Sequence, residues 1–369
     1  LMSDTVTHIV TARPRANLRY PAPYEKFAPP DATVVIDFTQ PMNPDVAQSH
    51  LRVMTEASVA SASHAEVAGK WSWPSATQAV FRPERSLSEA ATYRVSVTAG
   101  ALPAQGELGT PNDSTWTFTV APRPELVGSS PGDGDLSART ENQVTLEFSV
   151  PMDTPSVEKA LRIMPTPDTV NFRWERQNTR AIVNFPIDPS AEYRLLLGDG
   201  AIDSLGRLLR GNRSIVFRSA PLPAVTYLVG PRGYWNGTIG TYNPVPRVRQ
   251  YTQARNVEQL HYTLSSLDPA ALMAAYKNPW EQVDLSKLPH SEIAQWTQPV
   301  SGTLNKFTFV PTDVKTPGDG VYLLEVSGDN NTTDDARVLV VSRANLTFKM
   351  SERQAFVWAT DLNSGEPLG

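Results

Sequence analysis

An internal duplication restricts the fold of this chain more than any other feature of its sequence. Thr33–Asn43 (TVVIDFTQPMN) returns 110 positions later as Gln143–Asp153 (QVTLEFSVPMD), and Leu51–Met54 returns at the same offset as Leu161–Met164. Further along, the offset decreases, as loops of unequal length would make it. The repeat indicates two homologous modules of roughly 100 residues each, and the 369 residues of the chain leave room for more.

Both copies show the alternation of apolar and polar residues that is typical of β-strands. Every second residue is apolar in Val34–Phe38, and the pattern recurs in Val144–Phe148. A period of two places these residues on one face, which we expect to be buried. Turn sequences such as Ser130–Gly134 separate the short segments, which favours antiparallel β-sandwiches. The only helices expected here are one or two turns after Asn43 and after Asp153.

A change in composition at Pro221 marks a third region. Pro221–Pro223, like Ala121–Pro124 before it, predicts a proline-stiffened linker, so we expect a semi-rigid arm. Strand patterns follow near Val225–Leu228, Arg247–Tyr251, Gln259–Leu264, Lys306–Val310, Val321–Ser327 and Ala336–Ser342. Asp268–Tyr276 predicts a helix because a capping residue and a proline precede good helix formers, and Ser291–Trp296 is a second helical candidate.

Two further strand patterns lie at Leu346–Met350 and Phe356–Trp358. Two strands alone bury too little surface to be stable, so we expect them to begin a module that continues beyond this fragment. The predicted fold is all-β, with tandem antiparallel β-sandwich modules and a short helical insertion in the third. The predicted boundaries are residues 1–121, 122–220 and 221–344, and residues 345–369 supply the first strands of a truncated further module.

Composition excludes several classes of function. The formal net charge of −5 disfavours nucleic acid as a partner. The chain has no cysteine, which removes disulfide scaffolds, thiolate catalysis and Cys-ligated metals. No run of about 18 apolar residues is present, and the first residues lack the features of a signal peptide.

Local motifs favour structural over catalytic readings. Gly128–Gly132 fits the G-x-S-x-G pattern around a nucleophilic serine, but no helical pattern follows it, so we interpret it as a turn. The five histidines show no metal-ligand spacing; they are His8, His50, His64, His261 and His290. Asp329–Asp335 is rich in oxygen ligands but lacks EF-hand spacing, and we interpret it as a polar hairpin loop rather than a calcium site.

Two aromatic groups have open interpretations. By the repeat, Trp71 aligns with Trp174 as a recurrent core position, and Trp73 is left either exposed for ligand contact or packed against the N-terminal stretch. A second group contains arginines and tyrosines, and we expect it to mark the outer face of a strand or a module interface rather than a nucleic-acid site; its members are Arg247, Arg249, Arg255, Tyr242 and Tyr251.

The repeated residues resemble a known family. The pattern V-x-[LI]-x-F-x-x-P-M-[ND] in both copies resembles bacterial immunoglobulin-like (Ig-like) modules of surface proteins. Downstream, Gly318–Val326, Arg337–Ser342 and Gln354–Leu368 are similar to the macroglobulin modules of bacterial α2-macroglobulins. Ig-like modules followed by such modules resemble the N-terminal region of that family.

The resemblance implies a non-catalytic scaffold within a protease trap. In such a trap a protease cuts a bait segment and the molecule contracts around it, in some cases with a Cys–Gln thioester. This chain has neither a cysteine nor an evident bait, so the resemblance implies no catalytic, cofactor-binding or metal residue and no cofactor. It implies as partners the remaining modules of the parent chain and, through the full-length protein, target proteases, with membrane contact only through an anchor outside the fragment. The implied location is the periplasm or the cell surface.

Two other readings stay open. The modules could form the stalk or the binding modules of a bacterial surface adhesin or cell-wall protein, or they could flank an unseen catalytic domain.

Overall fold

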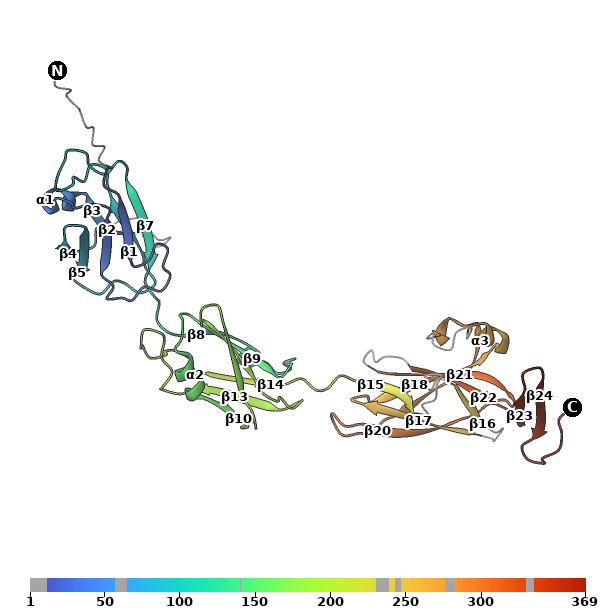
Figure 1. Cartoon of the computed structure of the whole chain (residues 1–369). Helices are drawn as coiled ribbons and strands as arrows, with labels where there is room; N and C mark the ends of the chain where they lie inside the picture. The colour runs from blue at the N-terminus through green and yellow to red at the C-terminus, as the bar shows by residue number, and fades with distance from the viewer. Residues whose placement is uncertain are drawn as a thin grey trace, which may run out of the picture. The chain divides into compact units, whose positions relative to one another are not determined.

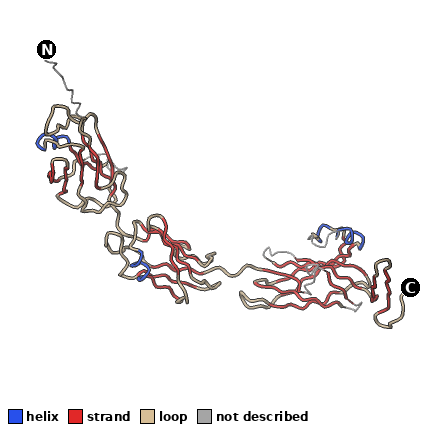
Figure 2. Tube along the Cα trace, in the orientation of Figure 1, coloured by secondary structure: helices blue, strands red, loops and turns tan. Residues whose placement is uncertain are grey.

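The computed structural model describes residues 12–56, 65–139, 141–229, 239–242, 247–275, 283–329 and 335–369. The chain divides into two compact units, Leu1–Ala220 and Pro221–Gly369 (Figure 1). Strands make up most of the regular structure in both, and the helices are short (Figure 2). The predicted all-β class is confirmed, and the division into the four proposed segments stays a prediction.

The first unit begins with a two-layer structure, termed the first sandwich. One sheet has the order β1-β2-β5-β4 and the other β3-β6-β7, and all neighbours are antiparallel. The elements are β1 (Ala16–Tyr20), β2 (Val34–Phe38), α1 (Pro44–Ala47), η1 (Gln48–His50), β3 (Leu51–Thr55), β4 (Gly69–Ser75), β5 (Gln78–Pro83), β6 (Thr92–Val97) and β7 (Ser114–Thr119). Alternate residues of β2 are buried against those of β6, as the period of two predicts.

The second sandwich repeats this topology. Its sheets have the orders β11-β12-β9-β8 and β10-β13-β14. The elements are β8 (Leu126–Ser130), β9 (Gln143–Phe148), α2 (Thr154–Ala160), β10 (Leu161–Met164), β11 (Asn171–Glu175), β12 (Arg180–Asn184), β13 (Glu192–Leu197) and β14 (Ser214–Arg218). The expected short helices form in both copies, because the side chains of Asn43 and Asp153 accept hydrogen bonds from the first-turn backbone.

The second unit contains a third sandwich. One sheet has the order β15-β17-β20 and the other β16-β22-β21-β18-β19, in which only β16 runs parallel to its neighbour among the described strands. The elements are β15 (Val225–Val229), β16 (Ile239–Tyr242), β17 (Val248–Arg255), β18 (Gln259–Leu267), α3 (Pro269–Ala275), η2 (Leu285–Lys287), β19 (His290–Pro299), β20 (Thr308–Val314), β21 (Gly320–Gly328) and β22 (Asp335–Val341). Helix α3 is the predicted insertion, although Tyr276 lies outside the described residues.

The second helical candidate of this region is wrong. Ser291–Trp296 lies within strand β19, which pairs antiparallel with β18 along its length. The indole of Trp296 stacks on the ring of Tyr262 in β18, with centroids 5.1 Å apart and planes 10° apart. Pairing across the sheet therefore outweighs the weak local helix signal of a six-residue segment.

The chain described here ends in a two-stranded hairpin, termed the C-terminal hairpin. Strands β23 (Ala344–Met350) and β24 (Ala355–Asp361) pair with each other and with no other described strand, at the end of the second unit (Figure 1). One face is mostly apolar, with Asp361 at its end, and its apolar residues are Ala344, Leu346, Phe348, Met350, Ala355, Val357 and Ala359. Phe348 and Met350 on this face are 60% and 76% exposed.

Candidate functional site

A polar cluster with a buried carboxylate is built on the loop Ala201–Leu209 of the second sandwich. Asp203 in this loop is only 1% exposed. Its carboxylate accepts hydrogen bonds from the backbone N–H groups of Leu205 (3.0 Å) and Arg207 (2.7 Å) and from the Arg207 side chain at Nε (2.8 Å). A buried carboxylate needs such partners, so Asp203 both shapes the loop and fixes the guanidinium of Arg207.

The other nitrogens of Arg207 reach the linker that precedes the second sandwich. They donate to the backbone oxygens of Pro122 (2.8 Å) and Ala121 (3.4 Å), and they lie 3.4 Å from the carboxylate of Glu89. Glu89 also accepts a hydrogen bond from Arg123 Nε at 2.8 Å. This bond and the charge of Glu89 raise the pKa of Arg123. The cluster of these four side chains, termed the linker cluster (Glu89, Arg123, Asp203, Arg207), joins a loop of each sandwich to the linker.

An apolar contact accompanies the linker cluster. Phe27, from the loop between β1 and β2, packs against the buried core of the second sandwich. Ion pairs that are partly exposed to solvent contribute little to stability by themselves. The burial of the apolar Phe27 side chain therefore adds to the stability of the contact between the two sandwiches. Together these groups can fix the linker, and they offer no chemistry for turnover.

The first sandwich has a counterpart of this loop with different side chains. Ala101–Gly109 takes the place of Ala201–Leu209, since both loops form the same antiparallel bridge to the residue after Pro in the Pro-Met motif. In place of the aspartate and the arginine, the first loop carries Pro103 and Glu107. Proline has no side-chain acceptor, so this copy cannot form an equivalent of the linker cluster.

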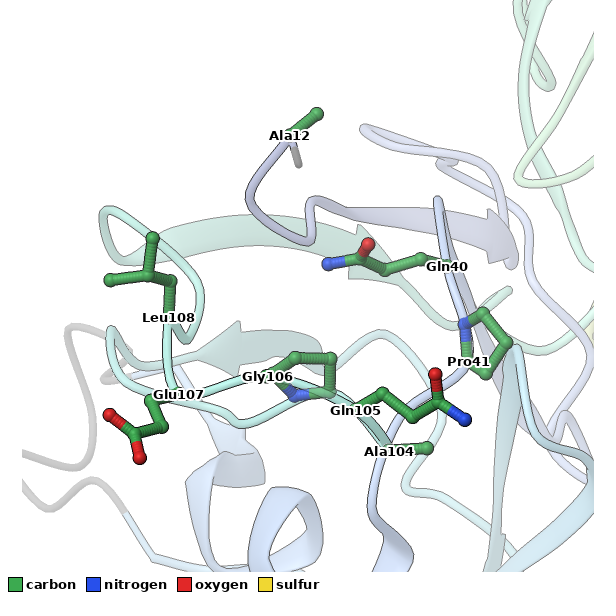
Figure 3. A pocket seen from close by; sticks show the side chains of 9 residues that line it. Ala12, Gln40, Pro41, Ala104, Gln105, Gly106, Glu107 and Leu108 are labelled. Carbon is green, nitrogen blue, oxygen red and sulfur yellow. The ribbon is translucent and has the colours of Figure 1, made fainter. Parts of the chain in front are cut away.

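A hollow of about 370 Å³ lies beside the first loop. Figure 3 shows Glu107 and Leu108 on one side of it and Pro41 with Gln105 on the other. Its lining residues are Ala12, Gln40, Pro41, Pro103, Ala104, Gln105, Gly106, Glu107 and Leu108. One carboxylate and two amides among these residues provide neither a nucleophile nor an acid–base pair.

The structure describes the candidate nucleophile, Ser130, and three of the five histidines. Ser130 ends strand β8, and the chain continues to another strand, β9, rather than into a helix. His50 Nδ1 is 2.8 Å from the hydroxyl of Thr98, and His290 Nδ1 is 2.7 Å from the backbone oxygen of Leu288. His261 lies in strand β18. His8 and His64 lie outside the described residues.

The proposed polar loop is described only at its ends, because residues 330–334 lie outside the described residues. Asp329 accepts a backbone hydrogen bond from Glu258 (3.1 Å), and Asp335 accepts one from Leu228 (2.7 Å). Both carboxylates thus bind the backbone of their own sandwich. Within the described ranges, no group of three or more His, Asp or Glu side chains is placed to hold a metal ion.

The structure corrects the alignment of the tryptophans. Trp73 stacks on Phe38 of β2, with centroids 5.7 Å apart, and Trp174 stacks in the same way on Phe148 of β9 at 6.1 Å. Because Phe38 and Phe148 are repeat partners, Trp73 and not Trp71 is the counterpart of Trp174. Trp73 is therefore a recurrent packing position. The sequence offers two tryptophans two residues apart in β4, and the changing offset between the two copies does not tell which of them is the repeat position.

The arginine and tyrosine group lies where the sequence places it, on the outer face of a strand. Arg249, Tyr251 and Arg255 alternate with buried residues along β17, and Arg249 makes a double hydrogen bond to Asp313 of β20 (2.8 and 3.1 Å). This bond and the positive charges of Arg249 and Arg247 lower the pKa of Asp313. Tyr242 lies instead in β16, in the other sheet.

The comparisons with known proteins bear on the first sandwich most directly. Residues 10–120 match the family of the bacterial Ig-like domain, which confirms the Ig-like resemblance for this part of the chain. A comparison with curated proteins finds no match. None of the helices in the described part of the chain has the length and the apolar character needed to cross a membrane.

Similar solved structures include two crystal structures of native alpha-2-macroglobulin from Escherichia coli. The fragment spanning domains MG0-NIE-MG1 is 12% identical, with a TM-score of 0.33, over 67% of this chain and 80% of that one. The NIE-MG1 fragment is 11% identical, with a TM-score of 0.31, over 40% and 74%. The N-terminal part of the bacterial S-layer protein SbsC is 12% identical, with a TM-score of 0.23, over 60% and 44%.

Proposed function

We propose that this chain is a non-catalytic scaffold region of a bacterial α2-macroglobulin-like protease inhibitor, placed in the periplasm or at the cell surface. The bait and any thioester belong to other parts of the parent protein, and the target protease meets this region only through the whole molecule. The sequence motifs shared with macroglobulin modules support this proposal, and they lie on β21, β22 and the C-terminal hairpin.

The C-terminal hairpin is the observation that carries the scaffold role. Its apolar face would be the inner face of a sandwich sheet, and two strands cannot form a stable sandwich on their own. We propose that further strands of the parent chain cover it. A succession of sandwiches with an exposed apolar face for contact with a further layer is suited to spacing and connecting other modules.

The experiment uses the whole parent protein beside this 369-residue chain. Each is incubated with an endopeptidase, and hydrolysis of a large protein substrate is compared with hydrolysis of a short peptide substrate. A trap encloses the protease, so the parent protein should suppress cleavage of the large substrate and spare the small one. The chain alone should suppress neither.

Two outcomes would contradict the proposal. A parent protein that leaves both activities intact is not a trap, and a chain that alone blocks both substrates would be a direct inhibitor. The non-catalytic role has a test of its own. Turnover of an ester substrate by the chain, lost in Ser130→Ala, would overturn it.

The second candidate function is that of binding modules in a surface adhesin or cell-wall protein. It is favoured by the exposed aromatic and cationic side chains on the outer face of the β15-β17-β20 sheet. Binding of the parent protein to isolated cell walls, without protease suppression, would favour it over the trap.

A further inference from the structure

The outer face of the β15-β17-β20 sheet, termed the aromatic face, exposes large apolar side chains. Residues 248, 250, 252 and 254 of β17 are buried, so the odd-numbered residues of that strand point outward. The same alternation turns Phe309 of β20 and Tyr227 of β15 outward. Tyr251, Phe307 and Phe309 are 45%, 42% and 59% exposed. Aromatic side chains gathered on one open face typically mark an interaction surface.

The aromatic face is ordered by contacts between its own side chains. The rings of Tyr227 and Phe307 meet nearly edge to face, with centroids 5.8 Å apart. The guanidinium carbon of Arg255 lies 4.8 Å above the centre of the Phe307 ring, and its Nε donates to the backbone oxygen of Pro223 at 3.2 Å. These contacts hold two rings and one planar cation in place before any ligand arrives, which lowers the entropy cost of binding.

Polar groups alternate with the rings across the sheet. Gln253 lies between Tyr227 and Phe309 in the cross-strand register, and its amide has no hydrogen-bond partner among the described residues. An apolar protein surface packed here would leave this amide buried without a partner, which is costly. A sugar ring suits the site better, since it offers an apolar face for stacking and hydroxyl groups for the amide.

The charge around the aromatic face is positive. Arg247, Arg249, Arg255 and Lys306 border it, and Asp313 is the one carboxylate in the outward row, already paired with Arg249. The whole chain carries a net charge of −5, so this face is a local exception. Surplus cations at an exposed site attract an anionic ligand.

We propose that the aromatic face binds an anionic polysaccharide, with sugar rings stacked on Phe307 and Phe309 and carboxylates paired with Arg247 and Arg255. The ligand is an extended one that runs along β17 and β20, because Arg247 and Arg255 lie at opposite ends of β17 and Phe307 and Phe309 lie beside the Arg255 end. This binding is independent of the trap, because it uses neither a bait nor the C-terminal hairpin.

The test titrates the full chain with oligogalacturonate, whose rings each carry a carboxylate, and follows binding by calorimetry. The matched ligand is the same oligomer with its carboxylates methyl-esterified, which keeps the rings and removes the charge. We expect the esterified form to bind at least tenfold more weakly. Raising the salt from about 0.05 to about 0.5 M should weaken only the acidic form, since salt screens exposed charges.

Two variants locate the binding on the aromatic face. Phe309→Thr removes one ring and keeps a residue that suits a strand, and it should weaken binding about tenfold. Arg255→Lys keeps the charge but loses the planar cation over Phe307, and it should weaken binding about threefold. The matched control is Phe348→Thr, because Phe348 is also a strand phenylalanine and is 60% exposed, against 59% for Phe309. The control should bind like the unchanged chain.

Several results would overturn the proposal. They are no binding of oligogalacturonate, equal binding of the esterified oligomer, or equal losses in Phe309→Thr and Phe348→Thr. Unchanged thermal unfolding of Phe309→Thr is the check on its fold. If Phe309→Thr instead dissociates an oligomer of the chain and the acidic oligomer does not bind, the face is a protein interface and the polysaccharide proposal is wrong.

Discussion

Replacing Arg207 by alanine tests the role assigned to the linker cluster. The side chain of Arg207 is 22% exposed and contacts Asp203, Glu89 and the backbone oxygens of Ala121 and Pro122. The substitution removes all these contacts together. We expect it to loosen both the loop of the second sandwich and its attachment to the linker.

The expected loss of stability depends on which hydrogen-bond partners Asp203 keeps after the substitution. In Arg207→Ala its buried carboxylate keeps the backbone donors of residues 205 and 207 but loses the guanidinium. Breaking a fully buried ion pair costs about 3–5 kcal/mol, and losing one hydrogen bond to a charged group costs about 1.5–3 kcal/mol. Because Arg207 is partly solvated and two donors remain, we expect a loss of about 2 kcal/mol in the free energy of unfolding of this region.

Urea unfolding of the full chain and hydrogen exchange of the amides at residues 205 and 207 measure this loss. The matched control is Arg213→Ala, which removes an arginine of the same sandwich whose partner, Asp199, is 93% exposed. We expect the control to change stability by less than about 0.5 kcal/mol. Equal effects of the two substitutions, or unchanged exchange at both amides in Arg207→Ala, would refute the reasoning.

Three further predictions concern single contacts. Tyr262→Phe should cost about 1 kcal/mol in urea unfolding, because the Tyr262 hydroxyl is buried 2.9 Å from that of Thr252, and the same change in a Thr252→Val background should cost less. Trp73→Ala should destabilise the chain by about 2 kcal/mol in the same assay, and a change below about 0.5 kcal/mol would show that the Phe38 stack contributes little. Arg249→Ala should raise the pKa of Asp313 toward its usual value in a carboxyl NMR titration. Since that pKa is lowered in the fold, the stabilisation is present above the pKa of an unfolded aspartate and is lost as the pH falls through the lowered value.

The parts of the fold that depend on local pattern were predictable from the sequence. The alternation in Val34–Phe38 and Val144–Phe148 identifies strands with one buried face, and the repeat extends that assignment to both sandwiches. Asn43 and Asp153, each followed by a proline in the first helical turn, identify the two short helices. In each case the signal and the structure that it specifies lie within a few residues of one another.

Features that depend on distant pairing were not predictable in this way. Ser291–Trp296 carries a weak helix signal, and only its partner strand β18 makes it a strand. The parallel pairing of β16 with β22 joins segments about 100 residues apart in the sequence, and no local sequence pattern predicts this pairing. The alignment of Trp71 with Trp174 failed because two tryptophans lie two residues apart in β4, and only the structure shows that Trp73 is the one that stacks on Phe38.

The linker cluster combines a feature that the sequence could not predict with one that it could have predicted. Its members come from three parts of the chain, so the sequence alone did not bring Glu89 together with Arg207. A signal was nevertheless present in the duplication, because Asp203 and Arg207 stand where the first copy has Pro103 and Glu107. Comparison of the two copies position by position, rather than a search for shared residues, would have singled out this loop.

The two copies of this loop separate what the fold requires from what the connection requires. Both keep the bridge to the Pro-Met motif, and both keep a glycine with positive φ, at Gly106 (φ +101°) and Gly206 (φ +78°). These shared features set the backbone path of the loop. At the glycine position, any residue with a β-carbon would be strained by the positive φ angle. The charged side chains of the loop are not required by this backbone path, and they differ between the two copies. In the second copy, Asp203 and Arg207 lie where the loop meets the linker. The sandwich thus provides a constant frame, and the residues of one loop adapt it to its neighbour along the chain.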